Sequence, residues 1–176
     1  MSISLDNIIA KLESGFVMNE TSPAIHRQVQ TSLKARQATM RLCAHASRAE
    51  LDQALAGLAP LPTHAPLRPA QTGLVMLQGR IGGDGAPFNL GEASASRAAI
   101  RLASGEIGFA YHLGRDLAKA NAAALLDALW QDEGRREAVS RALQPVAARL
   151  EAEAATTTRQ TAATKVNFFT MVRGED

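Results

Sequence analysis

The distribution of apolar and polar residues divides the chain into two helical flanks and a central β region. In the N-terminal flank, apolar residues recur every three or four positions, which is typical of helices that bury one face. A first helix is predicted over residues 3–12. A second helix begins at Pro23, because proline suits the first helical position, and runs to about Ala44. A short third helix follows Ser47, which forms a capping-box pattern with Glu50.

The central region carries short apolar runs separated by glycine-containing turns, the pattern of antiparallel strands joined by tight connections. Strands are predicted over residues 72–81, 88–102 and 107–113, and the second is expected to bulge near Gly91. Residues 58–70 contain four prolines. Because proline lacks a backbone donor and biases the residue before it away from helix, this segment is predicted to be a connector that leads into the sheet.

Two further helices are predicted behind the strands, over residues 116–130 and, with an interruption or bend near Pro145, over residues 135–154. Residues 156–161 are expected to loosen the chain before a final strand at 166–172. An antiparallel sheet usually has one face that must be covered. The fold class is therefore α+β: a central antiparallel β meander covered by helices, with N-terminal helices and a C-terminal strand-like tail.

The tail, residues 165–174, gathers large apolar side chains at the end of the chain. Termini fray unless they are held, and a compact apolar cluster left exposed promotes aggregation. We therefore expect the tail to be buried, either in the sheet of this chain or against a partner. The predicted interface residues are Phe168, Phe169, Met171, Val172 and Arg173, with Arg173 making a polar contact at the rim.

Composition narrows the class of protein. The 176 residues are 46% hydrophobic and carry a net charge of +2, which suits one ordinary core. Arginines alternate with acidic residues, so nucleic-acid binding is not predicted. No apolar run approaches the ~20 residues of a membrane helix, and the N-terminus lacks the apolar core of a signal peptide. The single cysteine, Cys43, excludes an internal disulfide, fits a reducing cytoplasm and is predicted to be a buried structural thiol rather than a nucleophile.

Motifs for catalysis are sparse. The glycine-rich segment 79–85 lacks the Gly-Lys-Ser/Thr of a Walker loop and the helix that follows a dinucleotide fingerprint, so a hairpin turn is predicted. Ser94 and Ser96 have no histidine at a spacing that would activate them. The four histidines are scattered, and neither a metal site nor a catalytic residue is predicted. Arg97 and Arg101 lie on one strand face, as would suit an anion or an interfacial carboxylate.

Several ordered blocks together resemble the PhnG family, a subunit of the bacterial carbon–phosphorus lyase system for phosphonate degradation. The resemblance runs from about Lys34 to the C-terminus and divides the chain into an N-terminal helical extension, 1–33, and a PhnG-like α+β domain, 34–176. The blocks that carry it are Thr72–Val75, Arg80–Gly85, Gly91–Ala98, Gly114–Asp116 and Val166–Gly174.

The resemblance implies a cytoplasmic subunit of a multi-subunit transferase, α-D-ribose 1-methylphosphonate 5-triphosphate synthase. That enzyme transfers methylphosphonate onto the ribose of MgATP and releases adenine. The implied partners are PhnH, PhnI, PhnJ and PhnL, with two copies of each core subunit and the catalytic centre in PhnI. The chain itself is expected to bind no cofactor, MgATP being the substrate of the complex.

Three roles are compatible with these observations. The chain can be an accessory subunit whose function is assembly through its tail. It can also contribute to a composite site in which Arg80, Arg97 and Arg115 hold the triphosphate or phosphonate, because guanidinium groups suit phosphate. The third possibility is a stand-alone anion-binding α+β module whose tail closes its own sheet.

Overall fold

A computed structural model describes residues 23–82 and 84–164. The chain divides into two compact units, residues 1–35 and 36–176. In the first unit the structure describes the start of helix α2 (Pro23–His45), which continues into the second unit. The predicted start and end of α2 are confirmed to within one residue.

The predicted helix at 3–12 and the predicted tail at 165–174 lie outside the described residues. The interface assignments to Phe168, Phe169, Met171, Val172 and Arg173 therefore stay predictions.

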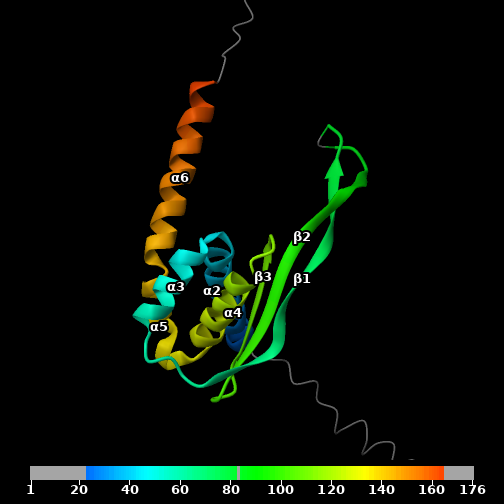
Figure 1. The fold of residues 1–176 in the computed structure, drawn as a ribbon. Helices are drawn as coiled ribbons and strands as arrows, with labels where there is room; N and C mark the ends of the chain where they lie inside the picture. Colours follow the sequence, from blue (N-terminus) through cyan, green and yellow to red (C-terminus); the bar gives the residue numbers. More distant parts are fainter. Residues whose placement is uncertain (1–22, 83, 165–176) are drawn as a thin grey trace, which may run out of the picture. The chain divides into compact units, whose positions relative to one another are not determined.

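The second unit is an α+β structure in which α4 packs on a three-stranded antiparallel sheet of order β1-β2-β3 (Figure 1). The predicted meander is confirmed. After α2 the elements are α3 (Arg48–Gly57), β1 (His64–Arg80), β2 (Pro87–Leu102), β3 (Ile107–Leu113), α4 (Leu117–Gln131), α5 (Glu133–Ala142) and α6 (Gln144–Ala163).

Local side-chain chemistry starts two of these helices where the sequence predicts. Ser47 Oγ accepts from the backbone N–H of Glu50 at 3.2 Å, and Glu50 Oε2 accepts from the N–H of Ser47 at 2.7 Å, which completes the capping box of α3. At α4, Asp116 Oδ1 accepts from the N–H of Lys119 at 2.8 Å. Each cap satisfies amide groups that have no partner inside the helix.

The prediction that residues 58–70 form only a connector is wrong, because β1 begins at His64. Pro66 and Pro69 lie inside this strand. Among the described strands, β1 lies at the edge of the sheet and pairs only with β2, and an edge strand tolerates proline where no ladder donor is needed. The register shifts on both sides of Arg68, which shows where the ladder accommodates the two prolines.

The predicted bulge near Gly91 is confirmed. The register passes from Leu77↔Gly91 directly to Gln78↔Asn89, so Leu90 is the extra residue of β2. The pairing of β2 with β3 extends only from Ala95 to Arg101. Among the described strands, the rest of β2 pairs only with β1.

The core lies between the sheet and the helices, and its contact with α4 is unusually close. Gly108 on β3 faces α4, and a Cβ atom built there would lie 2.0 Å from the carbonyl oxygen of Ala124 and 2.4 Å from the amide nitrogen of Ala128. Only glycine permits this approach of strand and helix. The largest fully buried apolar side chains of the core are Leu51, Leu102, Leu126, Leu129, Leu143, Val139 and Val146.

The C-terminal helices agree with the sequence prediction in one respect and differ from it in another. The predicted interruption near Pro145 is confirmed, because two helices meet at Leu143, with Pro145 in the first turn of α6. The predicted loosening over residues 156–161 is wrong, because α6 continues to Ala163. The threonine hydroxyl groups there donate to carbonyl oxygens four residues earlier, as Thr156 does to Ala152 at 2.9 Å, so these side chains are satisfied within the helix.

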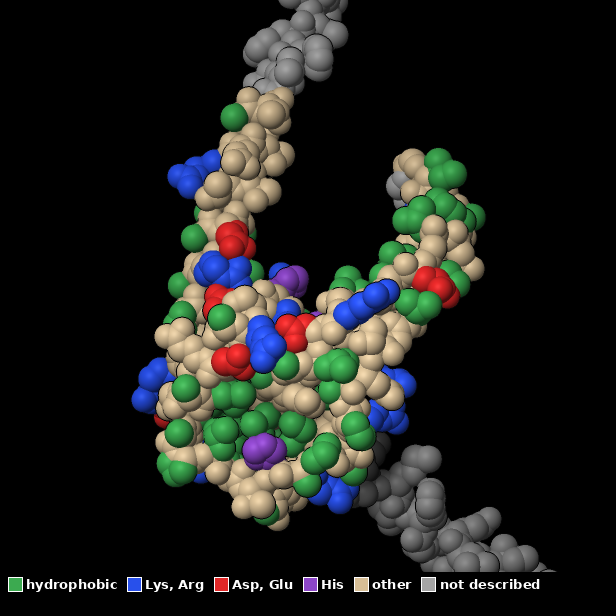
Figure 2. Space-filling view, viewed as in Figure 1, with side chains coloured by type: hydrophobic (Ala, Val, Ile, Leu, Met, Phe, Trp, Pro, Cys, Tyr) green, Lys and Arg blue, Asp and Glu red, His purple; other side chains and the backbone are tan. Residues whose placement is uncertain are grey.

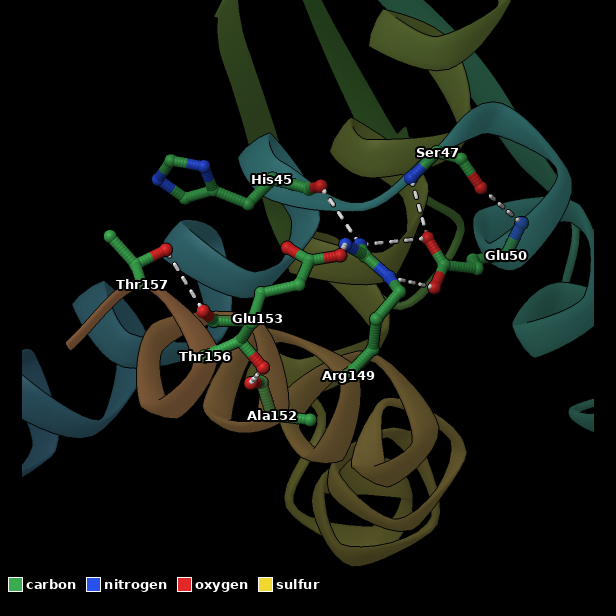
Figure 3. Close-up of polar contacts among 8 residues, drawn as sticks. All are labelled: His45, Ser47, Glu50, Arg149, Ala152, Glu153, Thr156 and Thr157. Carbon is green, nitrogen blue, oxygen red and sulfur yellow. Dashed lines mark hydrogen bonds and ion pairs between the residues drawn. The ribbon is translucent and has the colours of Figure 1, made fainter. Parts of the chain in front are cut away.

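Arg149 joins α6 to the corner between α2 and α3 (Figure 3). Its Nε and Nη2 donate to the two carboxylate oxygens of Glu50 at 2.7 and 3.1 Å, and Nη2 also reaches the carbonyl oxygen of His45 at 3.2 Å. Nη1 donates to Glu153 at 2.8 Å. The hydrogen bonds from Arg149 and from the N–H of Ser47 lower the pKa of Glu50 to about 2. This carboxylate therefore serves the cap of α3 and the attachment of α6 together.

Candidate functional site

The part of the β1–β2 hairpin beyond β3, which we call the β arm (residues 73–94), exposes an apolar surface. Figure 2 shows hydrophobic side chains along the arm and toward its tip. Six large apolar residues of the arm are 38–77% exposed: Leu74, Met76, Leu77, Ile81, Phe88 and Leu90.

These residues occupy both faces of the arm. Leu74 and Met76 pair with Ser94 and Glu92 on one face, whereas Leu77 lies on the other. A two-stranded hairpin is marginally stable in water, and exposed apolar patches of this kind mark interaction sites. The arm thus has the properties of an element that a second macromolecule covers.

The side of the sheet that faces away from α4, which we call the outer sheet face, is the second exposed feature. Its β3 residues Phe109 and Tyr111 are 49% and 55% exposed, and they lie opposite Ala99 and Arg97 of β2. A groove of about 430 Å³ runs over this face. It is lined by Met40, Leu67, Arg68, Arg97, Phe109 and Tyr111, with small alanines at its floor.

The three arginines predicted to hold an anion occupy different places. Arg80 donates from Nη1 to the carbonyl oxygen of Gly85 at 3.1 Å, within the hairpin end. Arg115 donates from Nε to Ser94 Oγ at 3.1 Å, on the α4 side of β2. Arg97 lies on the outer sheet face. Within this chain the three guanidinium groups do not form one cluster.

Two other arginines, Arg68 and Arg101, lie on the same face of the sheet as Arg97, and the sequence indicates only one of them. The shared face of Arg97 and Arg101 follows from their spacing of four residues along one strand. Arg68 joins them because it pairs with Ala99, between the two. No sequence signal locates Arg68, because it lies in the proline-containing segment that the sequence assigns to a connector.

Asp127 on α4 is a buried carboxylate that the sequence analysis did not identify. It accepts from Nε and Nη2 of Arg36 at 2.9 and 2.7 Å and from the backbone N–H of Phe109 at 2.8 Å. The hydrogen bond to Asp127 is the main cause that raises the pKa of Arg36. This group joins α2, α4 and β3, which is a structural function.

His112 and Cys43 line a small cavity of about 40 Å³ between α2 and β3. His112 is only 7% exposed, and neither ring nitrogen has a hydrogen-bond partner among the described residues. Burial is the main cause that lowers the pKa of His112, and burial raises the pKa of Cys43 to about 12. A buried thiol with a raised pKa is a poor nucleophile. The predicted burial of Cys43, which is 3% exposed, is confirmed.

Within residues 23–82 and 84–164, no three histidine, cysteine or acidic side chains lie together in a way that could hold a metal ion. Over the same ranges, no helix has the length and apolar character needed to cross a membrane.

An exposed apolar arm and an open face with aromatic and arginine side chains define a small α+β protein with surfaces of the kind that protein–protein interfaces use. The family described as phosphonate metabolism protein PhnG matches residues 34–174, and the chain belongs to that family. The family resemblance inferred from the sequence blocks is confirmed. A relative from Rhizobium meliloti (strain 1021), named alpha-D-ribose 1-methylphosphonate 5-triphosphate synthase subunit PhnG, is 52% identical over 137 residues, which cover 78% of this chain and 88% of the relative.

Proposed function

We propose that this chain is the PhnG-type subunit of an α-D-ribose 1-methylphosphonate 5-triphosphate synthase and that its role is assembly of the complex. Family membership and the name of the 52% identical relative support the subunit assignment. The observation that carries the assembly role is the β arm, whose apolar side chains are exposed on both faces.

In this proposal the complex transfers methylphosphonate onto the ribose of MgATP with release of adenine. PhnH, PhnI, PhnJ and PhnL are the partner subunits, and PhnI holds the catalytic centre. The assembly acts in the cytoplasm. The present chain then binds no cofactor by itself and acts on the reaction through the arrangement of its partners.

The arm suits insertion between partner surfaces rather than contact on one side. Covering only one face would leave either Leu74 and Met76 or Leu77 in water. Burial of apolar area contributes roughly 25 cal/mol per Å², and interface formation must also offset the loss of translational freedom. A partner that encloses both faces of the arm buries more of its apolar area than a partner that covers one face.

The test is co-expression of the tagged full chain with PhnH, PhnI, PhnJ and PhnL, followed by mass determination of the purified species. The double variant Leu74→Lys and Leu90→Lys places charge on the exposed arm, and Gln53→Lys adds charge to the exposed surface of α3 as a control. We expect the arm variant to lower recovery of the complex at least tenfold and the control to leave it unchanged. Fluorescence of Trp130, buried in the core, reports whether each variant is folded.

The outcomes separate the subunit from its proposed role. Failure of the wild-type chain to co-purify with any of these partners would refute the subunit assignment. Normal assembly of the arm variant would refute the role of the arm. Normal assembly with loss of MgATP-dependent adenine release would instead place this surface near the reaction and contradict a purely assembling role.

A further inference from the structure

We propose that the outer sheet face binds an acidic segment of another subunit of the same assembly, with Arg97 at the centre of the contact. This inference rests on the proposed function and concerns a surface different from the β arm.

The register places the contributing residues on one side of the sheet. Arg97 lies opposite Tyr111 on β3 and opposite Gln71 on β1. Arg101 lies four residues farther along β2, and Arg68 pairs with the intervening Ala99. The three arginines therefore surround one patch of the sheet, with about 13 Å between the Cα atoms of positions 97 and 101 at ~3.3 Å per residue.

This patch has an uncompensated positive charge. Among the described residues, Arg68, Arg97 and Arg101 form no ion pair, and the outward-facing positions of the three strands include no aspartate or glutamate. The nearest acidic residue on β2, Glu92, pairs with Met76 on the opposite face. A ligand for this surface should therefore be negatively charged.

Arg97 is held in place before any partner arrives. In the orientation that satisfies both groups, the amide oxygen of Gln71 accepts from Nε and Nη2 of Arg97 at 2.7 Å each. Among the described residues, Nη1 forms no hydrogen bond, so it is available to a further acceptor. Because Arg97 already has a fixed position, a bidentate or bridging contact with a carboxylate loses less side-chain entropy than a freely rotating arginine would.

The apolar part of the face argues for a protein segment over a small anion. Phe109 and Tyr111 form one wall of the groove, and Leu67 and Leu113, 47% and 66% exposed, extend the apolar surface beyond the arginines. Arginine and aromatic residues are enriched at the centres of protein interfaces, whereas lysine is depleted there, and the described strands contain no lysine. A tripolyphosphate-sized ligand would neutralise the arginines but leave the leucines in water.

Burial of the face determines the chemistry of its partner. Removing a guanidinium group from water without a counter-charge is strongly unfavourable. A segment that covers Phe109 and Tyr111 also covers the neighbouring Arg97, so it must supply carboxylate oxygens among apolar side chains. Surface complementarity of this kind also selects against neutral and basic segments.

The test uses the complex purified with the full chain. Arg97→Glu with Arg101→Glu should raise the dissociation constant of the complex at least tenfold and reduce its dependence on salt between 50 and 500 mM NaCl. Arg41→Glu, on the exposed surface of α2, is a charge-reversal control and should have no effect, and the single variant Arg97→Glu should have a weaker effect than the double variant. Arg97→Lys should retain assembly and places an amine on the face. A carbodiimide then joins that amine to a contacting carboxylate as an amide, with the carbodiimide converted to its urea.

A new cross-link from position 97 to an aspartate or glutamate of another subunit, located by mass spectrometry, would support the proposal. Unchanged assembly of the charge-reversed variant would overturn it while leaving the subunit assignment intact. Saturable binding of inorganic tripolyphosphate that Arg97→Glu abolishes, with assembly unchanged, would assign the face to a small anion instead. Dimerisation of the isolated chain that the same variant abolishes would assign it to a second copy.

Discussion

Replacement of Gly108 by alanine tests the closest contact in the structure. The added Cβ atom would lie 2.0 Å from the carbonyl oxygen of Ala124, 2.4 Å from the nitrogen of Ala128 and 2.8 Å from its Cβ. The atoms it meets include helix backbone, which cannot rotate away as a long side chain can. Restoring a separation of 3.4 Å from the oxygen of Ala124 requires α4 and β3 to move apart by about 1.4 Å.

This displacement sets the size of the expected effect. Overpacking a core costs ~1–3 kcal/mol, and a gap of ~0.5–1 Å loses a quarter to a half of the dispersion energy of the atoms on either side. The same movement strains the hydrogen bond from the N–H of Phe109 to Asp127, which spans α4 and β3. We therefore expect Gly108→Ala to lower the free energy of unfolding by about 3–4 kcal/mol, which is roughly 6–16 °C in Tm for a chain of this size.

The assay is urea unfolding of the full chain, followed by fluorescence of Trp130, the single tryptophan, which is buried in α4. Gly73→Ala is the matched control, because no atom outside its immediate neighbours lies within 4 Å of the added Cβ. This control should change stability by less than about 1 kcal/mol and can be stabilising. A loss below 1 kcal/mol for Gly108→Ala would show that α4 and β3 do not approach as closely as described.

Three further predictions concern buried or paired charges. Asp127→Asn should cost about 2–4 kcal/mol in urea unfolding, because Arg36 loses its partner and is only partly exposed. The lowered pKa of His112 means that the unfolded chain binds its proton more readily, so stability should be complete above about pH 6.5 and fall as the pH decreases below it. The pKa of Glu50, about 2 against an ordinary 4.5, predicts a contribution that is complete above pH 4.5 and lost toward pH 2. Glu50→Gln should cost roughly 0.5–1 kcal/mol at pH 7.

Each of these has its own control. Arg36→Ala should destabilise the chain more than Asp127→Asn, because it leaves the more buried partner, Asp127, as an unpaired charge; the reverse order contradicts the assignment. His112→Leu should flatten the pH dependence of stability between pH 5 and 7, and an unchanged slope would assign the effect to another group. For Glu50, equal destabilisation by Glu50→Gln at pH 7 and pH 2 would contradict a role that depends on its charge.

The sequence by itself determined most of the secondary structure, because the signals involved are local. Ser47 and Glu50 form a capping box within four residues, and the β3 limits, Ile107 to Leu113, follow from a short apolar run between glycine-containing turns. The family could also be inferred from ordered blocks of residues. The local signal of proline gave a wrong prediction for residues 64–70. These residues belong to β1, because an edge strand tolerates the missing backbone donor of Pro66.

The surfaces were decided by the tertiary structure. Arg97 and Arg101 share a face by strand periodicity, yet only the pairing of β1 with β2 brings Arg68 beside them and leaves Arg80 and Arg115 elsewhere. The exposure of the β arm depends on where β3 ends its pairing, at Ala95, and no residue within the arm encodes that limit.

Asp127 shows the same division between local and tertiary information. Its sequence position indicates only a helix residue among alanines and leucines. Its partners, Arg36 and the N–H of Phe109, lie 91 and 18 residues away. Periodicity and capping act over a few residues and are readable in the chain, whereas contacts between distant segments exist only after strands and helices have packed. For that reason the sequence determined the elements and the family, and the packed structure decided which side chains meet and which stay exposed to a partner.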